Sequence, residues 1–274
     1  MRSRFLLIFP LLIATGNLQA QLSHPKECSI TSLQVCALHV GQDELGIITS
    51  SVRTRPVDLL WLVPFGVATG AAIDYDAHAI RELGVDKKRE DRFETISNAG
   101  AFVVPVAATG IGYVVGSVTH NAYLKETAVL AGEAMVDATI LDQGLKYVIN
   151  RQDPRQGDAT GRFWPHGRKT WPDGQSMPSE HAMNVWAFAH VVAGQYDGIA
   201  TKAIVYGLAT TVSISRVEAR QHFPSDVLVG SAFGYLVGGY VLHHRSREKG
   251  NYFSFAPVST PNGQGMQISY NFAH

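Results

Sequence analysis

The sequence contains little charge and has no excess of either sign. Of its 274 residues, 23 are Lys or Arg and 23 are Asp or Glu, and charged residues make up only 17% of the chain. A protein that binds nucleic acid by neutralising phosphates needs a basic excess, and a disordered chain needs abundant charge with little apolar content. The equal numbers of basic and acidic residues exclude the first class, and the hydrophobic content of 46% excludes the second. We therefore expect a folded protein that does not bind nucleic acid.

The chain also lacks the hydropathy of a protein built mainly from lipid-facing helices. Its mean hydropathy is only +0.02, whereas its charged fraction lies below the roughly 25% of an average soluble domain. Composition alone therefore leaves two classes open, a membrane protein of modest hydrophobicity and an apolar soluble protein. The length allows one large domain or two small ones.

Residues 1–20 have the layout of a secretory signal peptide. Two arginines precede an apolar run that is too short to cross a bilayer comfortably, and Ala20 stands where cleavage would end. A signal anchor that stays attached is the alternative. Export would place Cys28 and Cys36, the only cysteines, in an oxidising compartment, where they could pair if the chain turns between them.

Six stretches have the apolar composition or spacing of helices. They are residues 59–73, 96–119, 125–150, 180–195, 201–215 and 226–243. The first two are uncharged and predict buried or membrane-inserted helices, whereas the charged stretch 81–94 between them predicts a solvated helix or loop. The third carries several charges in an apolar pattern, which suits a helix that lines a polar site.

Two further features concern packing. Gly230, Gly234 and Gly238 recur every four residues in the last predicted helix, which allows another helix to approach closely.

After residue 249 the period changes to the alternation of a strand, on both sides of a Pro-Asn-Gly turn. The alternation predicts a C-terminal β-hairpin in residues 249–274 that covers the helical body.

Polar residues gather in three clusters at the ends of the predicted helices. The clusters span residues 146–154, 178–181 and 215–226. Together they hold several cations, two histidines, and a carboxylate four residues after one of these histidines. Such a set suits an oxyanion.

Each cluster offers groups for binding a phosphoryl group. The cations Lys146, Arg151 and Arg216 could surround its oxygens, because Arg offers a fork of donors and Lys a point charge. Ser179 is a good N-cap for a helix that begins near Glu180, and the N–H groups of such a helix point at an anion.

The histidines offer a nucleophile and an acid. His222, followed by Asp226, has the arrangement in which a carboxylate holds one ring nitrogen and leaves the other free to attack. His181 opens a different helix and could protonate the departing alkoxide.

The order and spacing of these residues resemble those of the superfamily of type 2 phosphatidic acid phosphatases (PAP2) and vanadium haloperoxidases, whose motifs read Lys-x6-Arg-Pro, Pro-Ser-Gly-His and Ser-Arg-x5-His-x3-Asp. The third motif matches at every specified position, namely Ser215, Arg216, His222 and Asp226. The second matches at Pro178, Ser179 and His181, with Glu180 in place of Gly.

The resemblance implies an all-α fold, a six-helix bundle of the PAP2 or acid phosphatase type, here with the small C-terminal β-hairpin. With the signal peptide and hairpin read from the residues, the chain divides into a signal peptide (1–20), an N-terminal extension (21–55), a PAP2-like helical phosphatase domain (56–248) and the hairpin (249–274).

The resemblance also assigns roles to the site residues. His222 is the nucleophile that forms a phosphohistidine, Asp226 orients it, and His181 is the general acid. Lys146 and Arg216 bind the phosphoryl oxygens, and they are assisted by Ser179 and the Glu180 backbone. The resemblance implies no metal and no cofactor, since side-chain cations supply the electrostatic stabilisation.

The first motif departs from the family pattern, because Asp153 stands where the motif has Arg before Pro154. A carboxylate there removes one cation and adds a like charge, which weakens anion binding unless the side chain turns away or pairs with an arginine. Among the nearby cations, Arg151 is the expected substitute.

The sequence thus predicts a metal-independent phosphatase that hydrolyses a phosphate monoester or pyrophosphate through a phosphohistidine. Its substrate would be a lipid phosphate or a small soluble phosphate ester. The alternatives are a vanadate-dependent haloperoxidase and a non-catalytic phosphate-binding membrane protein. We expect an exported, periplasmic catalytic domain, either soluble or associated with a membrane, and a polytopic form is the alternative.

Overall fold

The computed structural model describes residue 28, residues 33–50, 55–165 and 174–246, and the backbone of 252–260 and 263–271. The predicted signal peptide lies outside the described residues. The helices are α1 (Leu33–Ser50), α2 (Leu59–Leu83), α3 (Lys87–Asn98), α4 (Val104–Val118), α5 (Ala122–Ile149), α6 (Glu180–Gln195), α7 (Ile199–Glu218) and α8 (Pro224–Arg245). A 3-10 turn (Pro56–Asp58) precedes α2, and a π-helical turn (Ala99–Val103) joins α3 to α4 in one continuous rod.

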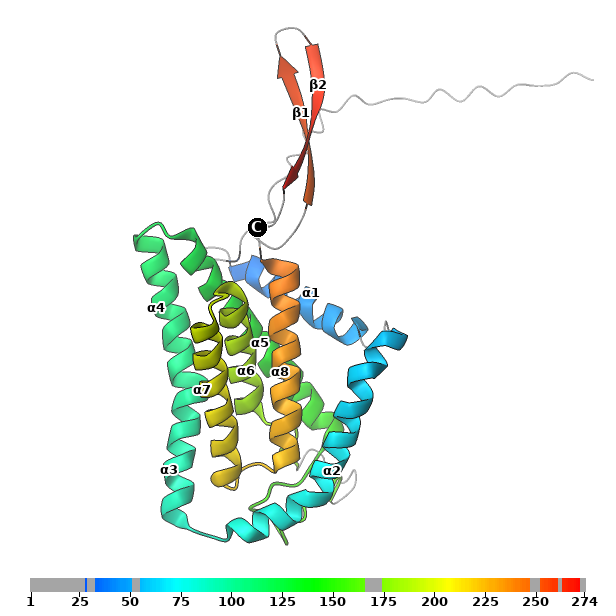
Figure 1. Ribbon diagram of the computed structural model, residues 1–274, viewed down its shortest axis with the longest axis vertical. Helices are drawn as coiled ribbons and strands as arrows, with labels where there is room; N and C mark the ends of the chain where they lie inside the picture. Colours follow the sequence, from blue (N-terminus) through cyan, green and yellow to red (C-terminus); the bar gives the residue numbers. More distant parts are fainter. Residues whose placement is uncertain are drawn as a thin grey trace, which may run out of the picture.

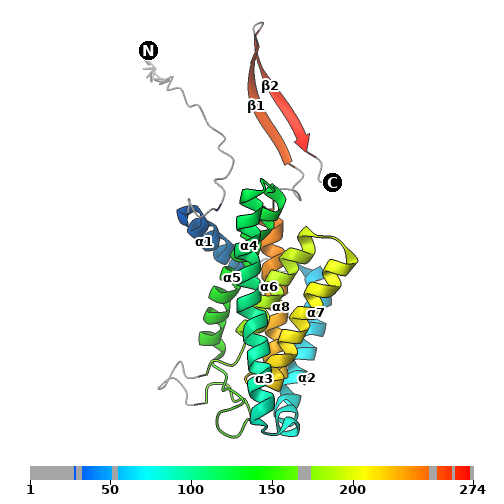
Figure 2. The same cartoon turned by 90° about the vertical axis from the view of Figure 1, so that its left-hand side faces the viewer.

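The rods pack around a pair formed by α6 and α8, with α5 and α7 beside them (Figures 1 and 2). The core between α5, α6 and α8 is made of fully buried apolar side chains, among them Met183, Val191, Val237 and Val241. The α2–α3, α5–α6 and α7–α8 connections meet at one end of the bundle, whereas α1 and the α4–α5 and α6–α7 connections lie at the other. The connections between helices that carry residues of the predicted phosphate site therefore lie at the same end of the bundle.

The glycine row of α8 brings two backbones into contact. A Cβ atom added at Gly230, Gly234 or Gly238 would collide with a main-chain carbonyl oxygen of α6. This contact confirms the close helix approach that the four-residue spacing predicted. It also fixes the start of α6 against α8, because Gly230 lies on the backbone of Ser179.

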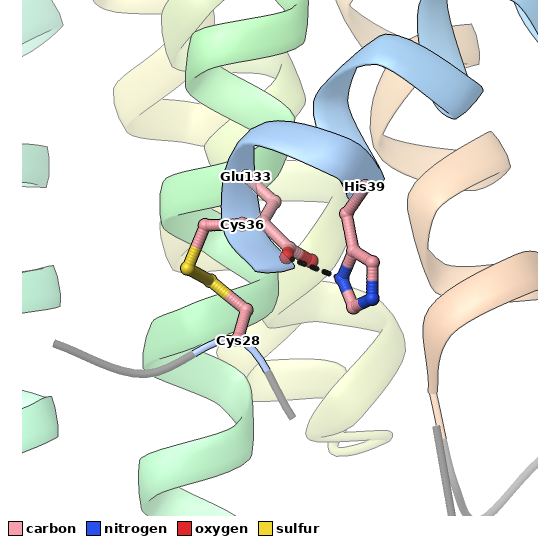
Figure 3. Close-up of a disulfide and its surroundings, with 4 residues drawn as sticks. All are labelled: Cys28, Cys36, His39 and Glu133. Carbon is pink, nitrogen blue, oxygen red and sulfur yellow. Dashed lines mark hydrogen bonds and ion pairs between the residues drawn. A yellow bond between two sulfur atoms is a disulfide. The ribbon is translucent and has the colours of Figure 1, made fainter. Parts of the chain in front are cut away.

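The helix α1 joins the bundle at the end away from these connections. Cys28 lies before α1 and forms a disulfide with Cys36 in its first turn, beside an ion pair between His39 and Glu133 of α5 (Figure 3). Farther along α1, Asp43 is buried and accepts hydrogen bonds from Arg245 at the end of α8. The N-terminal helix is thus fastened to α5 and α8 by side-chain contacts.

The helical bundle agrees with the prediction, with α1 as a seventh rod that packs on the expected six among the described residues. The predicted hairpin that covers the bundle is wrong. The described residues between 33 and 246 contain no strand. The pair β1 (Tyr252–Thr260) and β2 (Gly263–Asn271) is antiparallel and projects beyond the bundle instead of covering it (Figures 1 and 2). Alternation is a local signal that specifies strand pairing, and it carries no information on where the strands lie.

Within the part of the chain that the structure describes, three rods are long and apolar enough to cross a membrane, namely Pro56–Leu83, Lys87–Val118 and Pro224–Arg245. The first is longer than the 15-residue apolar stretch 59–73 suggested, because the helix continues through polar residues to Leu83. Large apolar side chains on these rods face outward, for example Leu60 at 77% exposure. A surface of this kind associates with a membrane.

We expect Gly234→Ala to destabilise the fold, because the added methyl group overpacks the contact between α6 and α8. Overpacking of this kind costs about 1–3 kcal/mol, which a lower midpoint of thermal unfolding in detergent would show. The matched control is Gly110→Ala in α4, where an added Cβ meets nothing within 4 Å. Equal midpoints for the two variants would contradict the tight contact.

Candidate active site

The predicted site residues come from the ends of four helices that meet at one end of the bundle. Lys146 lies in the last turn of α5, His181 in the first turn of α6, and Arg216 in the last turn of α7. His222 lies in the connection from α7 to α8, and Asp226 lies in the first turn of α8. Electrostatic interactions link His181 and His222 with both Lys146 and Arg216, so the structure brings these groups together.

The His222 ring is oriented by a main-chain carbonyl. Its Nδ1 donates to the carbonyl oxygen of Ser176 at 2.7 Å. Because a carbonyl only accepts, Nδ1 carries the hydrogen and Nε2 keeps its lone pair. Burial lowers the pKa of His222, which favours this neutral form. The ring therefore presents an unprotonated Nε2, as the predicted role of nucleophile requires.

Asp226 orients His222 indirectly. Its Oδ2 lies 3.8 Å from Nδ1 of His222, which is beyond hydrogen-bond distance. The same oxygen accepts from the Ser176 hydroxyl at 2.6 Å and from the Phe223 N–H at 2.8 Å. Asp226 thus fixes the residue whose carbonyl holds the ring, and the sequence pattern did not reveal Ser176 as this intermediary.

Arg151 lies in a buried ion cluster next to the site. One terminal nitrogen donates to Asp226 and to Ser225, both at 2.6 Å, and the other donates to Asp76 of α2 at 2.6 Å. Its Nε donates to the Gly161 carbonyl at 3.1 Å. The side chain is only 1% exposed, and its guanidinium also lies over two aromatic rings. This geometry does not favour the expected role of Arg151 as a substitute phosphate ligand.

Lys146 is shared between two carboxylates. Its Nζ lies 2.8 Å from Asp142 and 3.4 Å from Glu180, the residue that replaces the motif glycine. Both contacts offset the charge of the lysine in the absence of an anion. A bound phosphoryl group must therefore compete with them for the ammonium.

His181 and Arg216 share a partner that the sequence did not identify. Asn98 at the end of α3 places its Oδ1 2.8 Å from Nε2 of His181 and 3.4 Å from Nη1 of Arg216. Arg216 also donates to the Ser97 hydroxyl at 3.1 Å. Burial, together with the nearby cations, lowers the pKa of His181 to about 2, so its ring is neutral without a bound anion.

Asp153 forms part of the turn that follows Arg151. Its Oδ1 accepts from the Arg155 N–H at 2.7 Å, and burial raises the pKa of its carboxyl. The guanidinium of Arg155 reaches across to the Ala219 carbonyl at 2.7 Å and to Glu94 at 3.2 Å. Electrostatic interactions link both Asp153 and Arg155 to Arg216, so Arg155 is a further cation at the edge of the site.

The N-terminus of α6 offers further hydrogen-bond donors. Ser179 occupies the N-cap position, but its side chain makes no capping hydrogen bond. Its hydroxyl is buried and has no hydrogen-bond partner within the part of the chain that the structure describes. The hydroxyl and the first N–H groups of α6 can therefore bind an anion.

Among the described residues, no group of three or more His, Cys, Asp or Glu side chains is placed to hold a metal ion.

We expect Arg151→Met to unfold the protein or lower its stability strongly, because Asp76 and Asp226 would remain buried without their counter-ion. Breaking a buried pair by removing one partner costs about 3–5 kcal/mol, to be measured by chemical denaturation. The control is Arg162→Met, which removes an exposed ion pair with Asp158 in the same connection. A stable Arg151→Met variant that binds phosphate weakly would instead support the role expected from the sequence.

Comparisons with known proteins agree with the motif-based prediction. Residues 127–249, a little under half of the chain, match the family model of the PAP2 superfamily. Among solved structures, the chain is similar to the crystal structure of the first transmembrane PAP2 type phosphatidylglycerolphosphate phosphatase from Bacillus subtilis, with 19% identity over 77% of this chain and 97% of that chain and a TM-score of 0.47. None of the curated proteins matches the chain. Residues 127–249, which contain most of the site, are thus similar to the PAP2 superfamily.

Proposed function

We propose that the protein hydrolyses the phosphate monoester or pyrophosphate of a lipid through a phosphohistidine formed on His222. The observation that carries the proposal is the hydrogen bond from Nδ1 of His222 to the Ser176 carbonyl. It leaves the Nε2 lone pair available close to Arg216 and Lys146. Similarity to the superfamily supports phosphatase activity in general.

The first step transfers the phosphoryl group to the histidine. Nε2 of His222 attacks phosphorus, the bond from phosphorus to the ester oxygen breaks, and His181 gives its proton to the leaving oxygen. The negative charge of the bound phosphate offsets the cations around His181, which favours the protonated ring that this step requires. Arg216, Lys146 and the N-terminus of α6 stabilise the charge on the phosphoryl oxygens.

The second step releases phosphate. Water attacks the phosphorus of the phosphohistidine, the phosphorus–nitrogen bond breaks, and the neutral His181 accepts a proton from the water. His222 returns to its starting form, with the hydrogen still on Nδ1. The two steps consume one water molecule and produce phosphate together with the alcohol from a monoester, or with the lipid monophosphate from a pyrophosphate.

A lipid substrate fits the position of the site. The three apolar rods reach the end of the bundle at which the α2–α3 and α7–α8 connections lie (Figure 1). His222 lies in the α7–α8 connection. A phosphorylated head group could reach His222 there while its acyl or prenyl chain stays beside the apolar helices. This arrangement supports membrane association and favours a lipid phosphate over a small soluble ester.

Export of at least the N-terminal end is part of the proposal. The disulfide of α1 favours an oxidising compartment, since such bonds persist outside the cytosol. The predicted cleavage after residue 20 and the periplasmic location of the catalytic domain stay predictions.

The central test is His222→Ala, which removes the nucleophile. We expect wild type without added metal to hydrolyse an aryl phosphate and a lipid phosphate in micelles, and to be inhibited by orthovanadate. The variant should lose turnover by on the order of 10⁴-fold or more, whereas His243→Ala, at the opposite end of α8, should retain it.

Two outcomes would overturn this assignment. Activity that survives His222→Ala would exclude the phosphohistidine. Bromide oxidation by peroxide after vanadate loading, without phosphatase activity, would favour the haloperoxidase alternative.

The carboxyl of Asp153 should make phosphate binding depend on pH. Its raised pKa means that the group becomes neutral as the pH falls through that value, which removes a negative charge near Arg216. As the pH is lowered, we expect the KM of wild type for the same aryl phosphate to decrease. The KM of Asp153→Asn should be lower than that of wild type and depend less on pH. Asp153→Arg should lower KM further, and an unchanged or raised KM would show that the Asp153 carboxylate does not repel the phosphate.

A further inference from the structure

The Asn98 side chain lies between the predicted general acid and a phosphate-binding arginine. Its Oδ1 is 2.8 Å from Nε2 of His181 and 3.4 Å from Nη1 of Arg216. A guanidinium only donates, so the atom of Asn98 that faces it is the acceptor oxygen. Nε2 of His181 must then donate to the same oxygen, which places a hydrogen on Nε2.

A second group from the same segment holds the His181 ring. Phe102 lies edge-to-face with it, with ring centroids 4.7 Å apart. Phe102 belongs to the π-helical turn Ala99–Val103, which directly follows Asn98. Asn98 and Phe102 are four residues apart and so lie on one face of the rod, from which the amide and the aromatic ring both reach the same imidazole.

The π-helical turn is anchored against α7. Ala101 is fully buried in a cluster with Val212, and a Cβ atom added at Gly100 would collide with the Val212 side chain. The end of α3 therefore has little freedom to move relative to the helix that carries Arg216. Asn98 itself is exposed to solvent, so the loss of its side chain leaves no cavity in the core.

We propose that Asn98 is a positioning residue that fixes the tautomer and orientation of His181, so that proton transfer to the leaving group occurs from Nδ1. The proposal rests on the function proposed above and names a residue outside the three sequence motifs. The hydrogen bond at Nε2 keeps one hydrogen in place, and the second hydrogen of the protonated ring is then carried by Nδ1. Nδ1 gives this proton to the ester oxygen as the bond to phosphorus breaks, and it accepts a proton from water in the second step.

The test compares two leaving groups. An aryl phosphate with an acidic phenol leaves with little help from an acid, whereas an alkyl phosphate needs the proton. We expect Asn98→Ala to lower kcat for the alkyl phosphate by about tenfold to 10²-fold and to lower kcat for the aryl phosphate much less. KM should change less than kcat for both substrates, because Arg216 keeps its bond to Ser97.

Asn98→Asp provides the conservative variant. Its carboxylate can accept the same hydrogen bond and adds a negative charge next to the ring, which favours the protonated form. We expect it to restore hydrolysis of the alkyl phosphate and to move the high-pH limb of the kcat profile to higher pH. Thr95→Ala, an exposed change one turn earlier in α3, is the control and should match wild type.

The outcomes separate this inference from the function on which it rests. If wild type hydrolyses neither ester, or if His222→Ala retains activity, the proposed function fails. If wild type and His222→Ala behave as expected but Asn98→Ala lowers kcat equally for both leaving groups, or for neither, the positioning role is overturned. If Asn98→Ala does not fold, the pH profile of Asn98→Asp provides the test, and a profile identical to that of wild type also overturns the positioning role.

Discussion

The buried guanidinium of Arg151 joins three parts of the chain that are far apart in sequence. It binds Asp76 of α2 and Asp226 of α8 from the connection that follows α5. Two carboxylates and one cation are costly to bury, and close contacts with several hydrogen bonds are needed to offset the loss of hydration. The position of Asp226 depends on this cluster, Ser176 depends on Asp226, and the His222 ring depends on the Ser176 carbonyl. The proposed nucleophile is therefore positioned by an ion cluster outside the proposed phosphate-binding groups.

The cationic side of the site has a different character. Lys146 is held by Asp142 and Glu180, so it is partly neutralised before an anion arrives. Arg216 donates hydrogen bonds to neutral oxygens of Ser97 and Asn98, and an electrostatic interaction links it to the Asp153 carboxylate. In the proposed function the two cations thus differ in the contacts that they exchange for a phosphate, since Lys146 must weaken a direct ion pair and Arg216 hydrogen bonds to neutral oxygens.

Much of the site could be predicted from the sequence, because its motif residues lie at helix ends. Successive rods run in opposite directions, so Lys146, His181, Arg216 and His222 must meet at one end once the helices are assigned. The close contact between α6 and α8 was likewise visible in the spacing of the glycines.

The remaining contacts join residues that are far apart in sequence, so no pattern of neighbouring residues predicts them. Asp76 pairs with a residue 75 positions away, and Asp43 with one 202 positions away. Asn98 was hidden because the residues around it read as the start of an apolar helix, and a π-helical turn has no recognisable pattern in a single sequence. The seventh rod was missed for the same reason, since α1 joins the bundle through such distant pairs.

The first turn of α1, which carries the disulfide, lies toward one end of the bundle, and the α7–α8 connection, which carries His222, lies at the other (Figure 1). Glu133, whose side chain lies beside the disulfide, precedes Lys146 by 13 residues on α5. At 1.5 Å per residue this separation is about 20 Å along the helix, which is less than the roughly 30 Å hydrocarbon thickness of a bilayer. The disulfide and the site can therefore lie on the same side of a membrane, as the proposed periplasmic location of the catalytic domain requires.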